Sequence, residues 1–115
     1  MKKPDIIHLA ETESTNSYLK GLDAKASFAD GTVVYTDFQT GGRGQRGNSW
    51  ESERNLNLLF SLIIHPLHIH PTEHFIISQT IALAVAQTLE KYTSGIEIKW
   101  PNDIYYQDKK IAGIL

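Results

Sequence analysis

One long amphipathic helix, flanked on both sides by short strand-like runs, is the feature that most limits the fold. The stretch TEHFIISQTIALAVAQTLEKYTSG, residues 72–95, begins at Thr72, a possible cap, and closes at Gly95. Apolar residues recur along it at helical spacing: Ile77, Ile81, Ala84, Val85 and Leu89. We therefore expect a helix here with its aliphatic side chains in the core.

Apolar, β-branched and aromatic runs predict strands on both sides of this helix. They are DIIHLA, GTVVYTDFQ and LNLLFSLIIH before it, and IEIKW, DIYYQ and KIAGIL after it, with QDKK as a polar turn between the last two. The run LNLLFSLIIH is almost continuously apolar, which predicts a central strand buried on both faces. A first helix is expected in ETESTNSYLKGLD, capped by Ser14 or Thr15 and ending near Gly21. The pattern predicts an α+β (mixed α/β) fold with a mixed β-sheet flanked by helices.

Composition narrows the function classes. The 115 residues are 41% hydrophobic, enough for one globular domain, and their net charge of −2 gives no broad basic surface for nucleic acid or anionic lipid. There is no cysteine, which excludes disulfides and thiolate metal sites. Neither a signal peptide nor a membrane span is present in the sequence, so a cytoplasmic protein is expected.

The loop TGGRGQRGNSW, residues 40–50, has its glycines in the spacing G-x-G-x-x-G. A dinucleotide fingerprint is disfavoured, because a polar stretch and then a strand follow the loop where a helix is needed. An RNA-binding tract is disfavoured because the arginine-glycine unit occurs once, in a mildly acidic chain. A loop that holds another anion fits better, since glycines free backbone N–H groups and Arg43 and Arg46 add forked donors. Trp50 either stacks on a flat base or folds back on the core.

Three segments, ESTNSYL, QTGGRGQRGNSW and KWPNDIYYQDKKIAGIL, occur in an order and form that together resemble the catalytic domain of biotin protein ligases. The resemblance implies the class II aminoacyl-tRNA-synthetase-like fold of biotin and lipoate ligases, here truncated. It also implies a two-step reaction. ATP and biotin give biotinyl-5′-AMP and pyrophosphate with the help of Mg²⁺, and a lysine of the biotin carboxyl carrier protein then takes the biotinyl group. That carrier belongs to acetyl-CoA carboxylase or a related biotin-dependent enzyme.

The resemblance also assigns residues. Those expected at biotin are Ser14, Thr15, Asn16, Gln39, Arg43, Gly44, Gln45 and Lys110. Those expected at ATP or the adenylate are Gly42, Arg46, Trp50, Asn102 and Asp103, with Asp103 also a candidate magnesium ligand. Lys110 and Arg46 are expected to act in catalysis, because two reacting anions need positive charge between them. The family commonly has arginine where this chain has Gln45, so Gln45 is expected to contribute only its backbone.

Several alternatives stay open at this point. Ser14 or Thr15 can be a helix cap alone, and Asn102 with Asp103 a turn alone. The activity can be that of a lipoate ligase, or the chain can be an inactive biotin-binding fragment. Residues 1–115 are expected to be the N-terminal part of the catalytic domain, without a DNA-binding domain before it or the usual remainder after it. His65, His68 and His70 are close enough in sequence for a metal site, but the prolines around them favour a surface connection.

Overall fold

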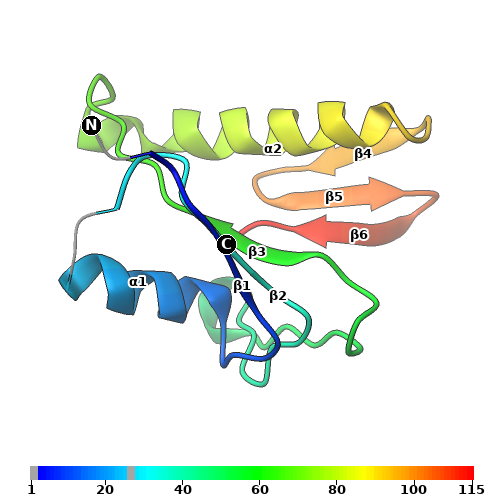
Figure 1. Cartoon of the computed structure of the whole chain (residues 1–115). Helices are drawn as coiled ribbons and strands as arrows, with labels where there is room; N and C mark the ends of the chain where they lie inside the picture. The colour runs from blue at the N-terminus through cyan, green and yellow to red at the C-terminus, as the bar shows by residue number, and fades with distance from the viewer. Residues whose placement is uncertain (1–2, 26–27) are drawn as a thin grey trace. The chain divides into compact units, whose positions relative to one another are not determined.

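The computed structural model describes residues 3–25 and 28–115, with the side chains of 23–25 left undescribed. The chain divides into two compact units, Met1–Pro66 and Leu67–Leu115 (Figure 1). Each unit has its own three-stranded sheet and its own helix. The expected α+β class is confirmed.

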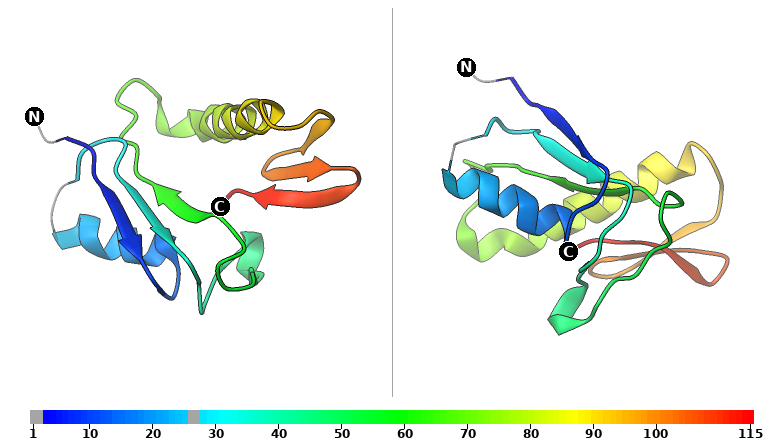
Figure 2. Two further views of the ribbon diagram at one scale, coloured as in Figure 1. Left: turned by 45° about the vertical axis from the view of Figure 1, so that its right-hand side comes forward. Right: turned by 60° about the horizontal axis from the view of Figure 1, so that its bottom comes forward.

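The first unit contains a mixed sheet covered on one face by a helix. Its strands are β1 (Ile6–Leu9), β2 (Val33–Thr36) and β3 (Leu59–Leu62), in the order β1-β2-β3. Strand β1 runs parallel to β2, and β3 runs antiparallel to it. Helix α1 (Thr15–Lys25) contacts β2 and β3 (Figure 2). Side chains alternate between the two faces of the strands, and those on the face that α1 covers are buried: Val34, Thr36, Leu59 and Ser61.

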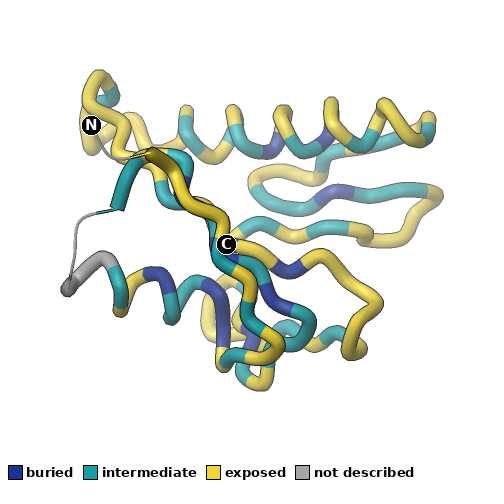
Figure 3. Tube along the Cα trace, viewed as in Figure 1, coloured by how far each residue is buried: buried dark blue, intermediate teal, exposed yellow. Residues whose placement is uncertain are grey.

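Strand β3 differs from the expected central strand. It lies at the edge of this sheet, because β2 takes the middle position between β1 and β3. Leu59 and Ser61 are buried, whereas Phe60 and Leu62 are 49% and 43% exposed. Buried and exposed colours accordingly alternate along β3 (Figure 3). An apolar run alone cannot distinguish a strand covered on both faces from one covered on a single face. The prediction of burial on both faces was therefore wrong.

Helix α1 begins where the sequence predicts and ends later. The Ser14 hydroxyl accepts a hydrogen bond from the N–H of Ser17 at 3.0 Å, so Ser14 is the cap and Thr15 the first helical residue. The helix passes Gly21 and reaches Lys25. A glycine within a helix costs only about 1 kcal/mol relative to alanine, and the buried Leu19 packs the helix against the unit. Gly21 therefore does not stop it.

The second unit packs one helix on an antiparallel sheet. Its strands are β4 (Ile96–Lys99), β5 (Asp103–Tyr106) and β6 (Lys109–Gly113). Helix α2 (His74–Glu90) lies along this sheet and contacts β4 and β5 (Figure 1). The core is formed by Ala82, Ala86 and Ile104, with Val85, Leu89, Ile96, Ile98, Ala112 and Ile114 packed against it.

Helix α2 corrects two details of the expected long helix. Thr72 lies inside a short 3₁₀ turn, η2 (Pro71–Glu73), where its N–H donates to the His70 side chain, so it does not cap α2. Of the five aliphatic residues expected in the core, Ala84 is exposed, and the buried alanines are Ala82 and Ala86. The apolar pattern covers more of the helix surface than one sheet can bury, so the sequence does not fix the buried stripe.

Both hairpins of the second unit have short connections. Trp100, Pro101 and Asn102 join β4 to β5, with a cis peptide bond between Trp100 and Pro101. Gln107 and Asp108 join β5 to β6, and both have positive φ angles, of 49° and 62°. Such a pair is typical of tight hairpin turns. The turn is thus shorter than QDKK, and both lysines belong to β6. Within the described ranges, no helix has the length and apolar character to cross a membrane.

Candidate functional site

A buried polar network joins the start of α1 to the end of β2 in the first unit. The side-chain oxygen Oε1 of Gln39 accepts hydrogen bonds from the Thr15 N–H at 2.9 Å and from the Thr15 hydroxyl at 3.3 Å. Ser14 and Thr15 are 4% and 3% exposed, so these groups are held away from bulk water. Both bonds use Oε1 of Gln39, and the NH₂ group is the donor end of the same amide.

Ser61 belongs to the same network and was missed by the sequence analysis. Its hydroxyl lies 2.7 Å from Oγ1 of Thr15 and also bonds Oδ1 of Asn16. The signal was present in the sequence, since Ser61 is a polar residue inside the apolar run LNLLFSLIIH. A buried polar side chain needs hydrogen-bond partners, so one on a strand facing a helix start indicates a network. Four of the expected biotin residues, Ser14, Thr15, Asn16 and Gln39, are thereby brought together.

Residues 40–50 form a closed turn, the glycine-arginine loop. Its two ends meet where Gly42 and Arg43 lie beside Ser49 and Trp50, and we call these four residues the neck. The Trp50 N–H donates to the Gly42 carbonyl at 2.9 Å, and Arg43 pairs with Ser49 in an antiparallel bridge. Gly42 has no room for a side chain, because a Cβ there would lie 2.4 Å from the Trp50 carbonyl oxygen. The tip is a 3₁₀ turn, η1 (Gln45–Gly47). The loop is thus set by backbone contacts at its neck.

The two arginines of the loop have different environments. The Arg43 guanidinium reaches back to the first turn of α1 and donates to the Ser17 hydroxyl. Arg46 is exposed at the tip, in the left-handed region with φ 55°. Gln45 beside it is also exposed. Ser17 is a second residue that sequence analysis did not single out, although it lies within the segment ESTNSYL. Arg43 is therefore anchored at the helix start that holds the polar network.

A cavity of about 310 Å³ lies beside the neck of the loop. One wall is formed by residues 38–42, which follow β2, and the other by residues 49–52. It is lined by Phe38, Gln39, Thr40, Gly41, Gly42, Ser49, Trp50, Glu51 and Ser52. Three residues expected at the ligands, Gln39, Gly42 and the half-buried Trp50, thus line one cavity.

The remaining expected residues lie in the second unit, where one face of the sheet carries charged side chains. Nζ of Lys110 lies 2.7 Å from Oδ1 of Asp103. Nζ of Lys99 lies 4.2 Å from the centre of the Tyr105 ring. The strand pairings place Lys99 opposite Asp103, and Tyr105 opposite Lys110. Paired residues share a face. We call the face with Lys99, Asp103, Tyr105 and Lys110 the charged face.

Strand β6 departs from regular alternation after Lys110. Alternation from Lys110 predicts that Ala112 and Ile114 share its face, yet both pack on the helix side with Ile104. The reason is a β-bulge. Lys110 pairs with Tyr105 and Ala112 with Ile104, which leaves Ile111 as an extra residue between them. Lys109 pairs with Tyr106, so the two lysines point to opposite faces.

Asn102 has a structural role in the second unit. Its side-chain NH₂ donates to the Ile114 carbonyl at 3.1 Å, and its own carbonyl accepts from the Ile114 N–H at 2.9 Å. These bonds fasten the β4–β5 connection to the end of β6. The turn interpretation of Asn102 therefore has direct support, and any part in adenylate binding stays a prediction.

No group of three metal-binding side chains occurs in the described part of the chain. His65 bonds Asp30, and His70 caps the η2 turn, so these histidines have local partners. Asp103 supplies a single carboxylate, and one of its oxygens already faces the Lys110 ammonium. Mg²⁺ needs several oxygen ligands, and phosphate oxygens commonly supply part of them. The residues present therefore do not form a magnesium site by themselves.

Known proteins share this fold. A biotin protein ligase from Aquifex aeolicus, solved with biotin and ATP, superposes with a TM-score of 0.81 at 34% identity over 96% of this chain and 45% of that one. The Leishmania major biotin protein ligase solved with biotin gives a TM-score of 0.83 at 26% identity, over 98% of this chain and 51% of that one. The architecture is thus that of biotin protein ligase catalytic domains.

Sequence comparison gives the family. The Biotin/lipoate A/B protein ligase family model matches residues 9–115, and the chain belongs to this family. The "Bifunctional ligase/repressor BirA" of Escherichia coli K12 is 38% identical over 104 residues. That match covers 90% of this chain and 32% of the relative, so the chain spans about a third of the relative's length.

Proposed function

We propose that the chain takes part in the ATP-dependent activation of biotin to biotinyl-5′-AMP and its transfer to a lysine of a biotin carboxyl carrier protein. Residues 1–115 would supply the first part of the catalytic domain. The observation that carries the proposal is the network of Thr15, Gln39 and Ser61 beside a cavity that Gln39, Gly42 and Trp50 line. The Aquifex aeolicus protein, which is named a biotin protein ligase and was solved with biotin and ATP, supports the same chemistry.

The polar network suits the ureido ring of biotin, which carries both donors and acceptors on a short edge. The Gln39 NH₂ group is a donor for a ligand carbonyl, since its oxygen is held by Thr15. The hydroxyls of Ser14 and Thr15 and the amide of Asn16 supply both kinds of group. Ser61 fixes the positions of Thr15 and Asn16. Gly44 and Gln45 would lie along the ligand, with the Gln45 N–H as a donor, because the Gly44 N–H already donates to the Asn48 carbonyl at 2.6 Å.

The first step joins two anions. A carboxylate oxygen of biotin attacks the α-phosphorus of ATP, the bond to the bridging oxygen breaks, and pyrophosphate leaves. Arg43, Arg46 and Lys110 are proposed to stabilise the negative charge that builds up in this step. In the second step, the carrier lysine attacks the biotinyl carbonyl, AMP leaves, and the amine loses a proton. Trp50 is proposed to stack on the adenine. Magnesium would enter with ATP, with Asp103 contributing at most one oxygen.

Calorimetric titration of the chain with biotin, lipoate and ATP tests the proposal. Biotin is expected to bind more tightly than lipoate. Tighter lipoate binding would favour a lipoate ligase, and biotin binding without ATP binding would indicate an inactive fragment. Catalysis is tested in a chimera in which this chain replaces the matched 104-residue segment of the E. coli relative. The chimera is expected to release pyrophosphate only when biotin and ATP are both present.

Hydrogen exchange is expected to be fast in the loop 41–48 without ligand and to slow when biotinyl-5′-AMP binds, most of all at Gln45, Arg46 and Gly47. The loop is rich in glycine and its tip is exposed, so little apolar packing holds it. The neck amide of Trp50, which already donates to Gly42, should change less. Equal protection of the tip with and without the adenylate would contradict a closing loop.

Replacing Arg46 with alanine is expected to let activated biotin escape from the chimera and label lysines of unrelated proteins. A lost hydrogen bond to a charged group costs about 1.5–3 kcal/mol, or about 10- to 150-fold in retention. The readout is a biotin blot of a mixed lysate. Exposed Lys20 on α1 gives a control for the loss of one positive charge, as Lys20→Ala. Labelling that stays confined to the carrier protein at an unchanged rate would exclude a phosphate role.

A further inference from the structure

Arg54 bridges two segments of the first unit that are far apart in sequence. Its guanidinium carbon lies 4.3 Å from the centre of the Phe38 ring, and its Nη2 lies 2.6 Å from Oε1 of Glu11. Phe38 follows β2, and Glu11 follows β1. One side chain from the segment after the glycine-arginine loop is thus in contact with the connections that leave both strands.

One of these contacts involves a residue that lines the cavity, since Arg54 lies against the Phe38 ring. Phe38 belongs to one wall, and Trp50, Glu51 and Ser52 form the other. Arg54 is only two residues beyond Ser52, so its contact with Phe38 ties the second wall to the first. A backbone bond supports the tie, since the Asn55 N–H donates to the Asp37 carbonyl at 3.0 Å. Asn55 itself has a φ of 64°, which turns the chain back after Arg54.

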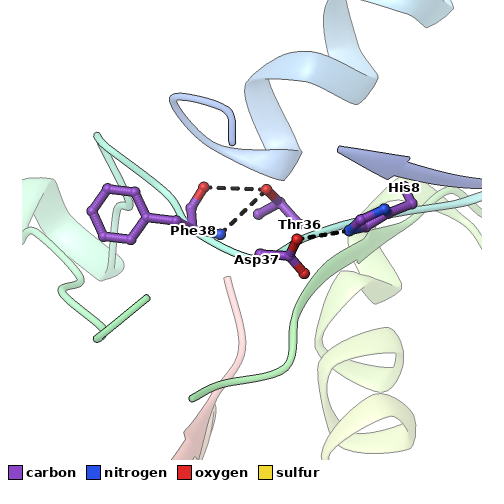
Figure 4. A network of polar contacts seen from close by, with 4 residues as sticks. All are labelled: His8, Thr36, Asp37 and Phe38. Carbon is purple, nitrogen blue, oxygen red and sulfur yellow. Dashed lines mark hydrogen bonds and ion pairs between the residues drawn. The ribbon is translucent and has the colours of Figure 1, made fainter. Parts of the chain in front are cut away.

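Phe38 is itself held in place by hydrogen bonds of its backbone. The Thr36 hydroxyl donates to the Phe38 carbonyl at 3.1 Å and accepts from the Phe38 N–H at 3.4 Å (Figure 4). Next to it, the Asp37 carboxylate lies 3.0 Å from Nε2 of His8 on β1. The Phe38 carbonyl also accepts from the Thr12 N–H at 3.2 Å. The residues 36–38 are therefore fastened to β1 and its following connection.

We propose that Arg54 is a positioning residue for nucleotide binding. By contacting Phe38 and Glu11 together, it holds residues 50–55 against the end of β2 and keeps Trp50 in the wall of the cavity before any ligand is present. The nucleotide base then meets a preformed surface, so less order has to be imposed on binding. This inference rests on the proposed function, which assigns Trp50 to the adenine.

Arginine is the residue that can make both contacts. Its planar guanidinium stacks on an aromatic face while its N–H groups remain free at the edge for a carboxylate. A lysine ammonium can keep the charge attraction to Glu11 but not the stacked geometry on Phe38. The ion pair alone is half exposed, at 54% and 49% for the two side chains, so it is screened by salt and contributes little. The stacking contact with Phe38 is expected to keep Arg54 in place at high salt.

The test uses the full chain with Trp100→Phe, which leaves Trp50 as its single tryptophan. Arg54→Ala, Arg54→Lys and the control Lys20→Ala are compared in this background. The first readout needs no ligand: acrylamide quenching of Trp50, and hydrogen exchange of the Trp50 and Asn55 amides. The second readout is the Kd for ATP and for biotin. Protection of core amides such as those of Val34 and Ile104 shows that each variant is folded.

Arg54→Ala is expected to increase quenching and exchange about threefold or more and to raise the Kd for ATP about three- to tenfold, with the Kd for biotin changed less than twofold. Arg54→Lys should recover less than half of the loss, and Lys20→Ala should match the parent. Unchanged quenching and exchange in a folded Arg54→Ala variant would overturn the inference, as would looser residues 50–55 with unchanged ATP affinity. A parent chain that binds neither biotin nor ATP would instead reject the proposed function, and the ligand-free readout would still decide whether Arg54 holds Trp50.

Discussion

Replacing Lys110 with alanine is expected to lower the rate of adenylation in the chimera about 10²-fold or more. The Lys110 ammonium lies on the charged face, 2.7 Å from Oδ1 of Asp103. As the carboxylate and phosphate approach one another, negative charge builds up, and a donor placed to meet that charge acts most strongly in the transition state. Its removal should therefore lower kcat much more than it raises the KM for biotin. Pyrophosphate release measures both.

Two further substitutions make this prediction specific. Lys110→Arg should restore only part of the rate, because a planar fork does not replace a compact ammonium between two anions. Lys109→Ala should change activity little, because Lys109 is exposed and points to the opposite face of β6. If Lys109→Ala abolished activity while Lys110→Ala retained it, the assignment of the charged face to catalysis would be wrong.

Replacing Gly42 with alanine is expected to open the neck of the glycine-arginine loop and to abolish measurable biotin binding. The new methyl group would lie 2.4 Å from the Trp50 carbonyl oxygen and 2.9 Å from Nε2 of Gln39. The first of these atoms belongs to the backbone. The Trp50 N–H also donates to the Gly42 carbonyl, so neither residue can move away without breaking this hydrogen bond. Overpacking of this kind costs about 1–3 kcal/mol and displaces the backbone.

Thermal unfolding and biotin titration of the full chain measure this effect. Gly21→Ala is the control, because nothing lies within 4 Å of the added carbon and the residue sits inside α1. That change should raise stability slightly, since alanine favours a helix by about 1 kcal/mol. Gly44→Ala is a second control for stability, as its Cβ would meet Asn48 at an ordinary 3.5 Å. Normal biotin binding by Gly42→Ala would show that the neck is not part of the site.

The sequence predicted those parts of the fold that depend on local chemistry. The Ser14 cap, the strand at Ile6–Leu9 and the three strands that follow α2 were all expected within a few residues. The Ser14 cap can be predicted because its contact with Ser17 lies within a few positions along the chain, whereas the expected Thr72 cap is replaced by the η2 turn. The opposite orientations of Lys109 and Lys110 follow from strand geometry.

The parts that could not be predicted depend on contacts between distant segments. The single buried face of β3 follows from its place at the sheet edge, which no property of LNLLFSLIIH reveals. The link between Thr15 and Ser61 spans 46 residues, and that between Arg43 and Ser17 spans 26. The contact between Arg54 and Phe38 is likewise invisible in the sequence. The residue types of the site were thus predictable, whereas the partners that orient them were not.

Because Ile111 is an extra residue in a bulge, β6 can lose it without turning Lys110 or Ala112 to the other face of the sheet. Removing one residue from a regular strand turns all later side chains to the opposite face. Here the extra residue lies between Lys110 and Ala112, so deleting Ile111 would leave Lys110 beside Asp103 and Ala112 against α2. Deleting Ala112 would instead transfer Ile111 to the core position. A comparison of chain lengths across homologous ligases should therefore find gaps tolerated at Ile111 and not at its neighbour.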